Sequence, residues 1–357
     1  MILNTYPDRP CGLPAFVVAL SLLLLLAGCL PSSCRRTESQ ALFPSDSASR
    51  RLAARTPTDT LRPLWQTDGP EAHPLKHPRT VQRGPDGQIY VGDLERSSIF
   101  VFDTSGAFQR EIQPDAFAYP YVAGWRGDTL MAYAAQARRF DFVVNDQIAR
   151  SVPVPGRRDL SEDALTYPAA TDSALYVKVV GEDAQNRVVR LGAGGSVQER
   201  WRLPGPRWRR AGLVRPRGDS LLSLSGYRPV IDVLHSGERS DAAVDTVRLR
   251  GFDSPMLARS RAFVQGDADE PPLLSASADP AGEGLFVLNM RPARLRVDVY
   301  DRRGRLQHVL VGRKQARSVF PMDLAVWRAP GGGYALATVA ARPEPRLTFY
   351  RWHRLPL

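Results

Sequence analysis

The stretch Gly84-Pro85-Asp86-Gly87-Gln88-Ile89-Tyr90-Val91-Gly92-Asp93 places a turn directly before a short run of strand-forming residues. Glycine, proline and aspartate favour turns, whereas isoleucine, tyrosine and valine favour strands. A second run with its own turn follows at Ile99-Phe100-Val101-Phe102-Asp103-Thr104-Ser105-Gly106. Runs of this kind, separated by such turns, predict strands over residues 80–83, 88–92, 98–102 and 108–112.

The same pattern of a turn and a β-rich run recurs along the chain. The runs are centred on Ile89, Leu130, Leu175, Leu221, Leu285 and Tyr334, so the steps between them are 41, 45, 46, 64 and 49 residues. A four-stranded propeller blade takes about 40–50 residues. The 30 prolines and 28 glycines suit an all-β chain, and no stretch of a dozen residues shows helical apolar spacing. We therefore predict an all-β, six-bladed β-propeller with four-stranded antiparallel blades.

The strands of the last repeat predict how the ring closes. That repeat supplies only three strands, over residues 322–327, 333–338 and 346–352. Residues 61–66 are expected to add the missing outer strand, and Pro63 within them suits an edge position. Closure by an N-terminal strand joins the ends of the ring and removes an exposed sheet edge. The propeller domain is therefore expected to occupy residues 61–357.

The two quoted stretches resemble an NHL-type repeat, a family that builds six-bladed β-propellers. Residues 297–304 are similar in their closing Asp-x-x-Gly turn, and Asn186-Arg187-Val188 resembles the Asn-Arg-Ile piece of the motif. Blades two, four and six depart from the motif and follow by period alone. The resemblance implies a propeller of the NHL-repeat-like or TolB-like class. Some propellers of this class are lactone or ester hydrolases with a channel metal, and others are lyases that use histidine-bound zinc.

An apolar run at residues 13–27 ends in Leu26-Ala27-Gly28-Cys29, which resembles a bacterial lipoprotein signal. Small residues before the cysteine admit a peptidase, and Cys29 presents its thiol for lipid attachment, including palmitate. The alternative is an uncleaved anchor or a core segment, but the run is shorter than the roughly 20 residues that cross a bilayer. We predict a signal peptide over residues 1–28 and a lipid-anchored protein of the bacterial cell envelope. Leu30, in place of an aspartate, favours the outer membrane, facing the periplasm or the surface.

The composition changes after the lipidation motif. Residues 29–60 are rich in serine, threonine, arginine and alanine without a hydrophobic period, which predicts a lipidated, disordered tether. The three cysteines, Cys11, Cys29 and Cys34, all precede the propeller. The domain must therefore be held together by its apolar core and not by disulfides.

Arginine supplies most of the positive charge of the chain, whose net charge is +11. In a propeller, the loops between second and third strands and the loops between blades lie on one face. The guanidinium group suits bidentate recognition of carboxylate, phosphate or sulfate. We therefore predict a face for an anionic ligand, whose candidate residues are Arg96, Arg138, Arg187, Arg228, Arg294 and Arg209. The structural alternative is pairing of these arginines with acidic neighbours such as Asp93.

The residues that support an enzyme are sparse. The five histidines are scattered, and Pro74 interrupts the spacing between His73 and His77 that a helical metal pair would need. No Gly-x-Ser-x-Gly motif occurs, and the acidic run at residues 267–272 lacks the glycine and the distant glutamate of a calcium loop. Asp93 and Asn289 form the one equivalent polar pair between blades. No catalytic residue is predicted, and a metal in the channel is left open.

The sequence thus favours a non-catalytic binding or scaffolding module in the cell envelope, formed by a monomeric domain without a cofactor. Its expected partners are the membrane, through the lipid on Cys29, and an envelope protein or an anionic glycan or lipid. Nucleic acid is not expected as a partner of an exported protein. The alternative is a metal-assisted hydrolase or lyase with its site at the mouth of the propeller channel.

Overall fold

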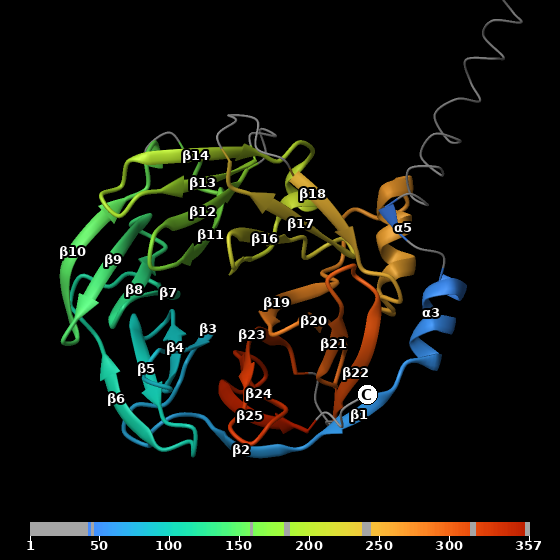
Figure 1. The fold of residues 1–357 in the computed structure, drawn as a ribbon, viewed down its shortest axis with the longest axis horizontal. Helices are drawn as coiled ribbons and strands as arrows, with labels where there is room; N and C mark the ends of the chain where they lie inside the picture. Colours follow the sequence, from blue (N-terminus) through green and yellow to red (C-terminus); the bar gives the residue numbers. More distant parts are fainter. Residues whose placement is uncertain are drawn as a thin grey trace, which may run out of the picture.

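The computed structural model describes residues 42–43, 46–157, 160–181, 186–237, 244–314 and 319–353. The predicted signal peptide and Cys29 lie outside these residues. The described strands form six sheets arranged as a closed ring around a central axis (Figure 1). This arrangement confirms the predicted six-bladed propeller of antiparallel, four-stranded blades. Within the described residues, no helix is long and apolar enough to span a membrane.

The first five blades each use four consecutive strands that pair in chain order as antiparallel meanders. The strands are β3 Pro78–Arg83, β4 Ile89–Asp93, β5 Ser98–Phe102 and β6 Phe108–Ile112 in blade one; β7 Pro120–Arg126, β8 Thr129–Ala134, β9 Arg139–Val144 and β10 Gln147–Pro153 in blade two; β11 Leu165–Ala170, β12 Leu175–Val180, β13 Arg187–Leu191 and β14 Val197–Arg202 in blade three; β15 Val214–Arg217, β16 Ser220–Leu224, β17 Val230–His235 and β18 Val244–Arg248 in blade four; and β19 Ser275–Ala281, β20 Gly284–Asn289, β21 Arg296–Tyr300 and β22 Leu306–Gly312 in blade five.

Blade six closes the ring as predicted. Its strands are β23 Pro321–Arg328, β24 Tyr334–Ala340 and β25 Arg346–Trp352, and its outer strand is β2 Pro63–Thr67 from the N-terminal part of the chain. β2 pairs antiparallel with β25, with Trp65 opposite Phe349. The indole of Trp65 stacks on Phe349 with ring centroids 5.1 Å apart, and its Nε1 donates a hydrogen bond to the Thr104 carbonyl in blade one. Blade six is therefore joined to blade one through this strand.

Part of the segment that was expected to be a disordered tether is ordered. Helix α3 spans Asp46–Arg55, and β1, Thr58–Leu61, pairs in parallel with β22 to add a fifth strand to blade five. Only Leu61 of β1 is buried. The strand therefore lacks the alternation of apolar and polar residues by which a half-buried strand is recognised. The ordered structure thus begins before residue 61.

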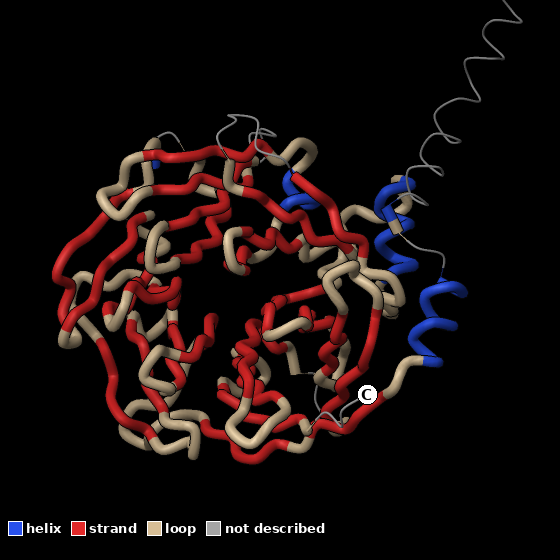
Figure 2. The backbone as a smooth tube through the Cα atoms, in the orientation of Figure 1, coloured by secondary structure: helices blue, strands red, loops and turns tan. Residues whose placement is uncertain are grey.

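The long step between blades four and five holds helix α5, Leu257–Gln265, and a shorter helix, α4, Arg207–Arg210, precedes blade four. Leu257 is buried in the apolar core, and Phe263 packs edge-to-face on Trp208 at 5.3 Å. Gly266 ends α5 in the left-handed conformation, which glycine adopts without steric cost. The tube view shows α3 and α5 at the outer rim of the ring, away from its centre (Figure 2).

Candidate functional site

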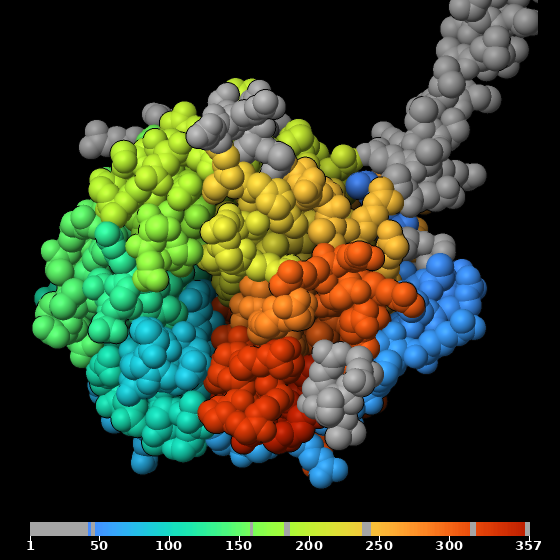
Figure 3. Space-filling model, in the orientation of Figure 1, coloured from blue at the N-terminus to red at the C-terminus, as the bar shows by residue number. Residues whose placement is uncertain are grey.

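A cavity of about 900 Å³ lies where the inner strands of the blades begin, at one mouth of the central channel. Its walls come from strands β3, β7, β11 and β23 and from the loops between second and third strands in blades two and four. The space-filling view shows the blades packed around the centre of the ring (Figure 3). The side chains that give the cavity its chemistry are Arg79, Tyr121, Arg138, Arg157, Glu162, Tyr167, Tyr227 and Met322.

Arg79 is a cation of this cavity, and most of its donors remain available. It is half-buried near the start of β3. Among the described residues, its guanidinium contacts one hydrogen-bonding partner, the weakly accepting sulfur of Met322 at 3.5 Å from Nη1. A guanidinium carries five N–H donors in a planar fork. Arg79 can therefore offer a bidentate contact to an anion inside the cavity.

Three tyrosines from blades two, three and four surround the same space: Tyr121, Tyr167 and Tyr227. Burial raises the pKa of the Tyr167 hydroxyl above its usual range, the hydroxyls of Tyr227 and Tyr121 add to the rise, and the charge of Arg79 opposes it. Tyr167 is therefore a neutral hydrogen-bond donor at physiological pH. The cavity combines aromatic faces, hydroxyl groups and the cation of Arg79.

The other two arginines of the cavity hold its rim in place. Arg138 donates from Nη1 to the carbonyls of Arg157 and Leu160, at 3.2 and 2.9 Å, and from Nη2 to the carbonyls of Ser161 and Glu162, at 2.6 and 3.5 Å. Arg157 donates in turn to the Ala137 carbonyl at 3.3 Å. These contacts hold the connection between blades two and three against the loop between strands β8 and β9, so they shape the cavity.

A buried ion pair between Arg215 and Asp323 lies in the channel. Arg215 and Asp279 also line a smaller cavity there, with a volume of about 250 Å³. Arg215 donates to Asp323 Oδ1 at 2.6 Å, and Ser277 donates to the same oxygen at 2.6 Å. The other carboxylate oxygen of Asp323 accepts the Val81 N–H at 3.0 Å. Burial in the channel raises the pKa of Asp279 to about 7 against the opposing charge of Arg215. This cluster links blades one, four, five and six.

The six arginines predicted as an anion-binding face do not converge on one cavity. Arg138 lines the channel mouth, whereas Arg187 lines a separate groove beside blade three. Arg96 pairs with Glu111 at 3.5 Å, and Arg228 donates to the Arg209 carbonyl at 3.1 Å. Arg209 also lies over the indole of Trp208, and Arg294 is exposed.

The nominated polar pair has structural contacts in both blades. The Asp93 carboxylate accepts the N–H groups of Lys76, His77 and Arg96. The Asn289 amide donates to the Asp298 carboxylate at 2.6 Å and to the Asp253 carbonyl at 3.0 Å.

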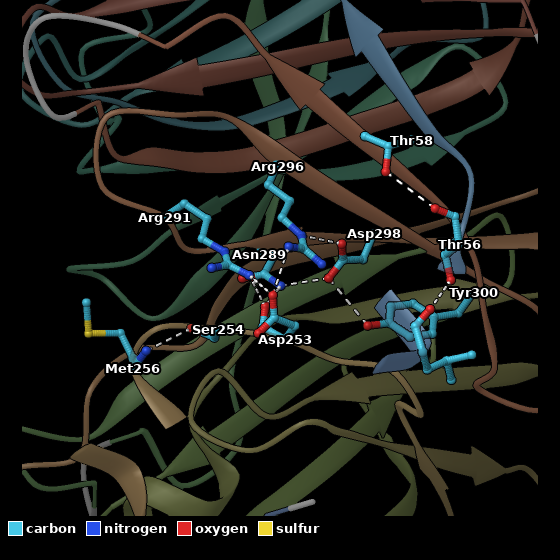
Figure 4. Close-up of polar contacts among 11 residues, drawn as sticks. Thr56, Thr58, Asp253, Ser254, Met256, Asn289, Arg291, Arg296, Asp298 and Tyr300 are labelled. Carbon is cyan, nitrogen blue, oxygen red and sulfur yellow. Dashed lines mark hydrogen bonds and ion pairs between the residues drawn. The ribbon is translucent and has the colours of Figure 1, made fainter. Parts of the chain in front are cut away.

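Around Asn289, the Asp253 carboxylate accepts hydrogen bonds from Arg291 and Arg296 at 2.9 and 3.4 Å (Figure 4). Arg296 also donates to Asp298 at 2.7 Å. These contacts connect the insertion that carries α5 to blade five. Arg291 therefore holds the insertion against blade five, and it does not line the channel-mouth cavity.

The histidines lie away from the channel mouth. His73 contacts Glu111 at 2.6 Å, His77 faces Glu95 at 3.6 Å, and His235 faces Asp245 at 3.3 Å. None of the five histidines lines the channel-mouth cavity, and among the described residues Glu162 is the one acidic side chain that does. In the part of the chain that the structure describes, no three His, Cys, Asp or Glu side chains are grouped as ligands for a metal ion.

Comparison with known proteins supports the fold. No protein-family model and no curated protein matches the sequence. Among solved structures, a streptogramin B lyase matches with a TM-score of 0.50 and 11% identity, over 81% of this chain and 98% of the lyase. A virginiamycin B lyase from Staphylococcus aureus has a TM-score of 0.45 at 11% identity, over 79% of this chain and 86% of the lyase. A protein of unknown function from Bacteroides caccae has a TM-score of 0.46 at 11% identity, over 68% of this chain and 90% of that protein. At this identity, the likeness concerns the propeller architecture.

Proposed function

We propose that the protein is a non-catalytic binding module of the bacterial cell envelope, and that its channel-mouth cavity takes an anionic ligand with sugar-like faces. The observation that carries this proposal is the availability of the Arg79 guanidinium within a ring formed by Tyr121, Tyr167 and Tyr227. A guanidinium binds a carboxylate in bidentate geometry, and aromatic faces pack against the apolar side of a ring. An acidic glycan combines the two features.

The envelope location in this proposal rests on the sequence. The apolar run ending in Leu26-Ala27-Gly28-Cys29 supports export and lipidation at Cys29. Lipid chains on one cysteine would anchor the protein stably only if two or more are attached. The propeller would then bind its ligand at the membrane surface, where acidic glycans are available to an anchored protein.

The alternative, a metal-assisted hydrolase or lyase at the same mouth, needs carboxylate, amide or imidazole groups that converge on a metal. Among the described residues, the cavity lining has one carboxylate, that of Glu162, and no imidazole. The likeness to a streptogramin B lyase concerns the fold, so it gives no residue-level support for a reaction. The arrangement of the cavity therefore favours ligand binding.

Calorimetric titration of trigalacturonate into the purified full chain tests the proposal. We expect saturable binding by the wild type and a loss of about tenfold or more in affinity for Arg79→Gln, because a charge-assisted hydrogen bond contributes about 1.5–3 kcal/mol. Arg294→Gln is the matched control, because it removes the same charge from an exposed position outside the cavity. Its affinity should stay within about twofold of the wild type.

Two results would contradict the proposal. One is a wild-type affinity that Arg79→Gln leaves unchanged, and the other is no binding at millimolar trigalacturonate. A fall in melting temperature after treatment with a chelator, restored by zinc or calcium, would instead favour the metal-assisted alternative.

A further inference from the structure

A second large cavity lies outside the channel, in the groove between blades two and three. It has a volume of about 850 Å³. One wall comes from residues 155–156, 160–161 and 164 of the connection between the two blades, and the other comes from blade three itself. The groove is separate from the channel mouth, since Arg79, Tyr121, Tyr167 and Tyr227 do not line it.

Three arginines face this groove from neighbouring strands. Arg187 on β13 lies directly opposite Arg202 on β14, and Arg200 lies opposite Val189. Because side chains alternate across a strand, Arg187, Arg200 and Arg202 all project from the same face of blade three. Arg200 and Arg202 are exposed, and no hydrogen bond or ion pair of either guanidinium occurs among the described residues.

Arg200 and Arg202 lie two residues apart on the same face of β14, so their like charges repel each other. No acidic residue stands among the described residues that line the groove. Glu199, the acidic neighbour in sequence, faces the other way and lies 3.8 Å from Arg190. An anion placed between the guanidinium groups of Arg200 and Arg202 would relieve this repulsion.

The remaining walls indicate what kind of anion fits. Leu160, Val179, Leu203 and two prolines, Pro155 and Pro204, give the groove apolar surface beside the charge. Asn186 is buried and holds one end of the groove: its amide donates to the Gly205 carbonyl at 2.7 Å, and its Oδ1 accepts the Gly181 N–H. The volume exceeds what a bare oxyanion occupies. The groove therefore has room for an organic group next to the charge.

We propose that this groove binds the phosphate of an organic phosphate ester, with Arg200 and Arg202 as its principal contacts. Two guanidinium groups neutralise the two charges of a phosphate monoester, and each can donate two parallel N–H bonds to its oxygens. The apolar wall takes the organic part of the ester. The ester can be a soluble phosphate or a lipid headgroup, because both present the same phosphate chemistry.

Titration of glycerol 3-phosphate into the full chain tests this site. Arg200→Gln/Arg202→Gln should weaken binding about a hundredfold, because each of the two guanidinium groups is expected to strengthen binding about tenfold. The matched control is Arg259→Gln/Arg303→Gln, which removes two exposed arginines from α5 and from blade five. The control and Arg79→Gln should both bind glycerol 3-phosphate like the wild type. Failure of trigalacturonate binding at the channel mouth would leave this result unaffected.

Thermal unfolding supplies a second readout that a merely structural role would not produce. Without ligand, Arg200→Gln/Arg202→Gln should melt at or above the wild-type temperature, because the repulsion between Arg200 and Arg202 is removed. With glycerol 3-phosphate, the wild type should gain melting temperature and the double variant should not. Equal ligand-induced gains in both proteins, or no gain in the wild type, would overturn the proposal.

A comparison of two esters separates the sources of the phosphate. Dihexanoyl phosphatidic acid below its micellar concentration carries the same phosphate monoester as glycerol 3-phosphate, with added acyl chains. Binding that is at least tenfold tighter for the lipid, and abolished in the double variant, assigns the groove to a lipid headgroup. Equal binding assigns it to soluble phosphate esters. Lipid binding that survives in the double variant would contradict the proposed contacts.

Discussion

At the residue scale, Lys178 on β12 shows how burial changes the chemistry of one side chain. It is 1% exposed, and its Nζ donates to the Leu224 carbonyl in blade four at 2.9 Å. Loss of hydration lowers its pKa from 10.5 to about 7, against the attraction of Asp232. Between these values the unfolded chain binds more protons than the folded one. The free energy of unfolding should therefore rise as the pH increases from 7 to 10.5.

We predict that Lys178→Met removes this rise, which amounts to a few kcal/mol. Denaturant unfolding at several pH values across the window would measure it. Lys76→Met is the control, because that side chain is exposed and its removal should preserve the wild-type pH dependence. A Lys178→Met protein whose stability still rises like the wild type would show that Lys178 keeps its charge in the fold.

At the element scale, β2 closes the ring, and Trp65 is the side chain by which it does so. The indole contacts Phe349 of blade six and the Thr104 carbonyl of blade one. We predict that Trp65→Ala lowers the free energy of unfolding by about 2–3 kcal/mol, somewhat less than for a fully buried tryptophan, because Trp65 is half-buried. Guanidinium chloride unfolding would measure the decrease.

The neighbouring Leu64 provides the comparison on the same strand. It is 59% exposed, so Leu64→Ala should change the stability by no more than about 0.5 kcal/mol. Equal decreases for the two variants would mean that β2 contributes through its backbone pairing with β25 and not through the Trp65 side chain.

At the scale of the whole molecule, the Asp323 carboxylate links blades that are distant in sequence. Its oxygens accept hydrogen bonds from Val81 in blade one, Arg215 in blade four and Ser277 in blade five. Removing one partner of a buried ion pair leaves the other charge uncompensated. We predict that Asp323→Ala lowers the free energy of unfolding by about 3 kcal/mol or more.

An exposed ion pair serves as the control for this prediction. Glu283 and Arg302 lie 2.9 Å apart with side chains 75% and 64% exposed. Glu283→Ala should therefore change the free energy of unfolding by less than about 1 kcal/mol. Replacing both buried partners, as Arg215→Met/Asp323→Leu, should recover much of the stability that Asp323→Ala removes. An Asp323→Ala protein as stable as Glu283→Ala would exclude a stabilising role for the link across the channel.

Most of the blade architecture could be predicted because its signals are local in the sequence. The turn residues and strand-forming runs around Ile89 and Leu285 repeat at the blade period, and this period predicted six blades. The missing outer strand was likewise predicted at the position that β2 occupies. Strand β1 was not predicted, because its one buried side chain, Leu61, leaves no periodic pattern to recognise.

The amino-acid sequence by itself thus determined the all-β class, the number of blades and the strand that closes the ring. The tertiary structure decided which polar groups remain available. Arg138 was a candidate for binding an anion, yet its donors are taken up by four backbone carbonyls, whereas Arg79 precedes Thr80 in what reads as an ordinary strand. Arg79, Tyr167 and Tyr227 come from three different blades. Whether such distant side chains meet, and whether their charges are already paired, depends on how the ring closes and not on any local pattern.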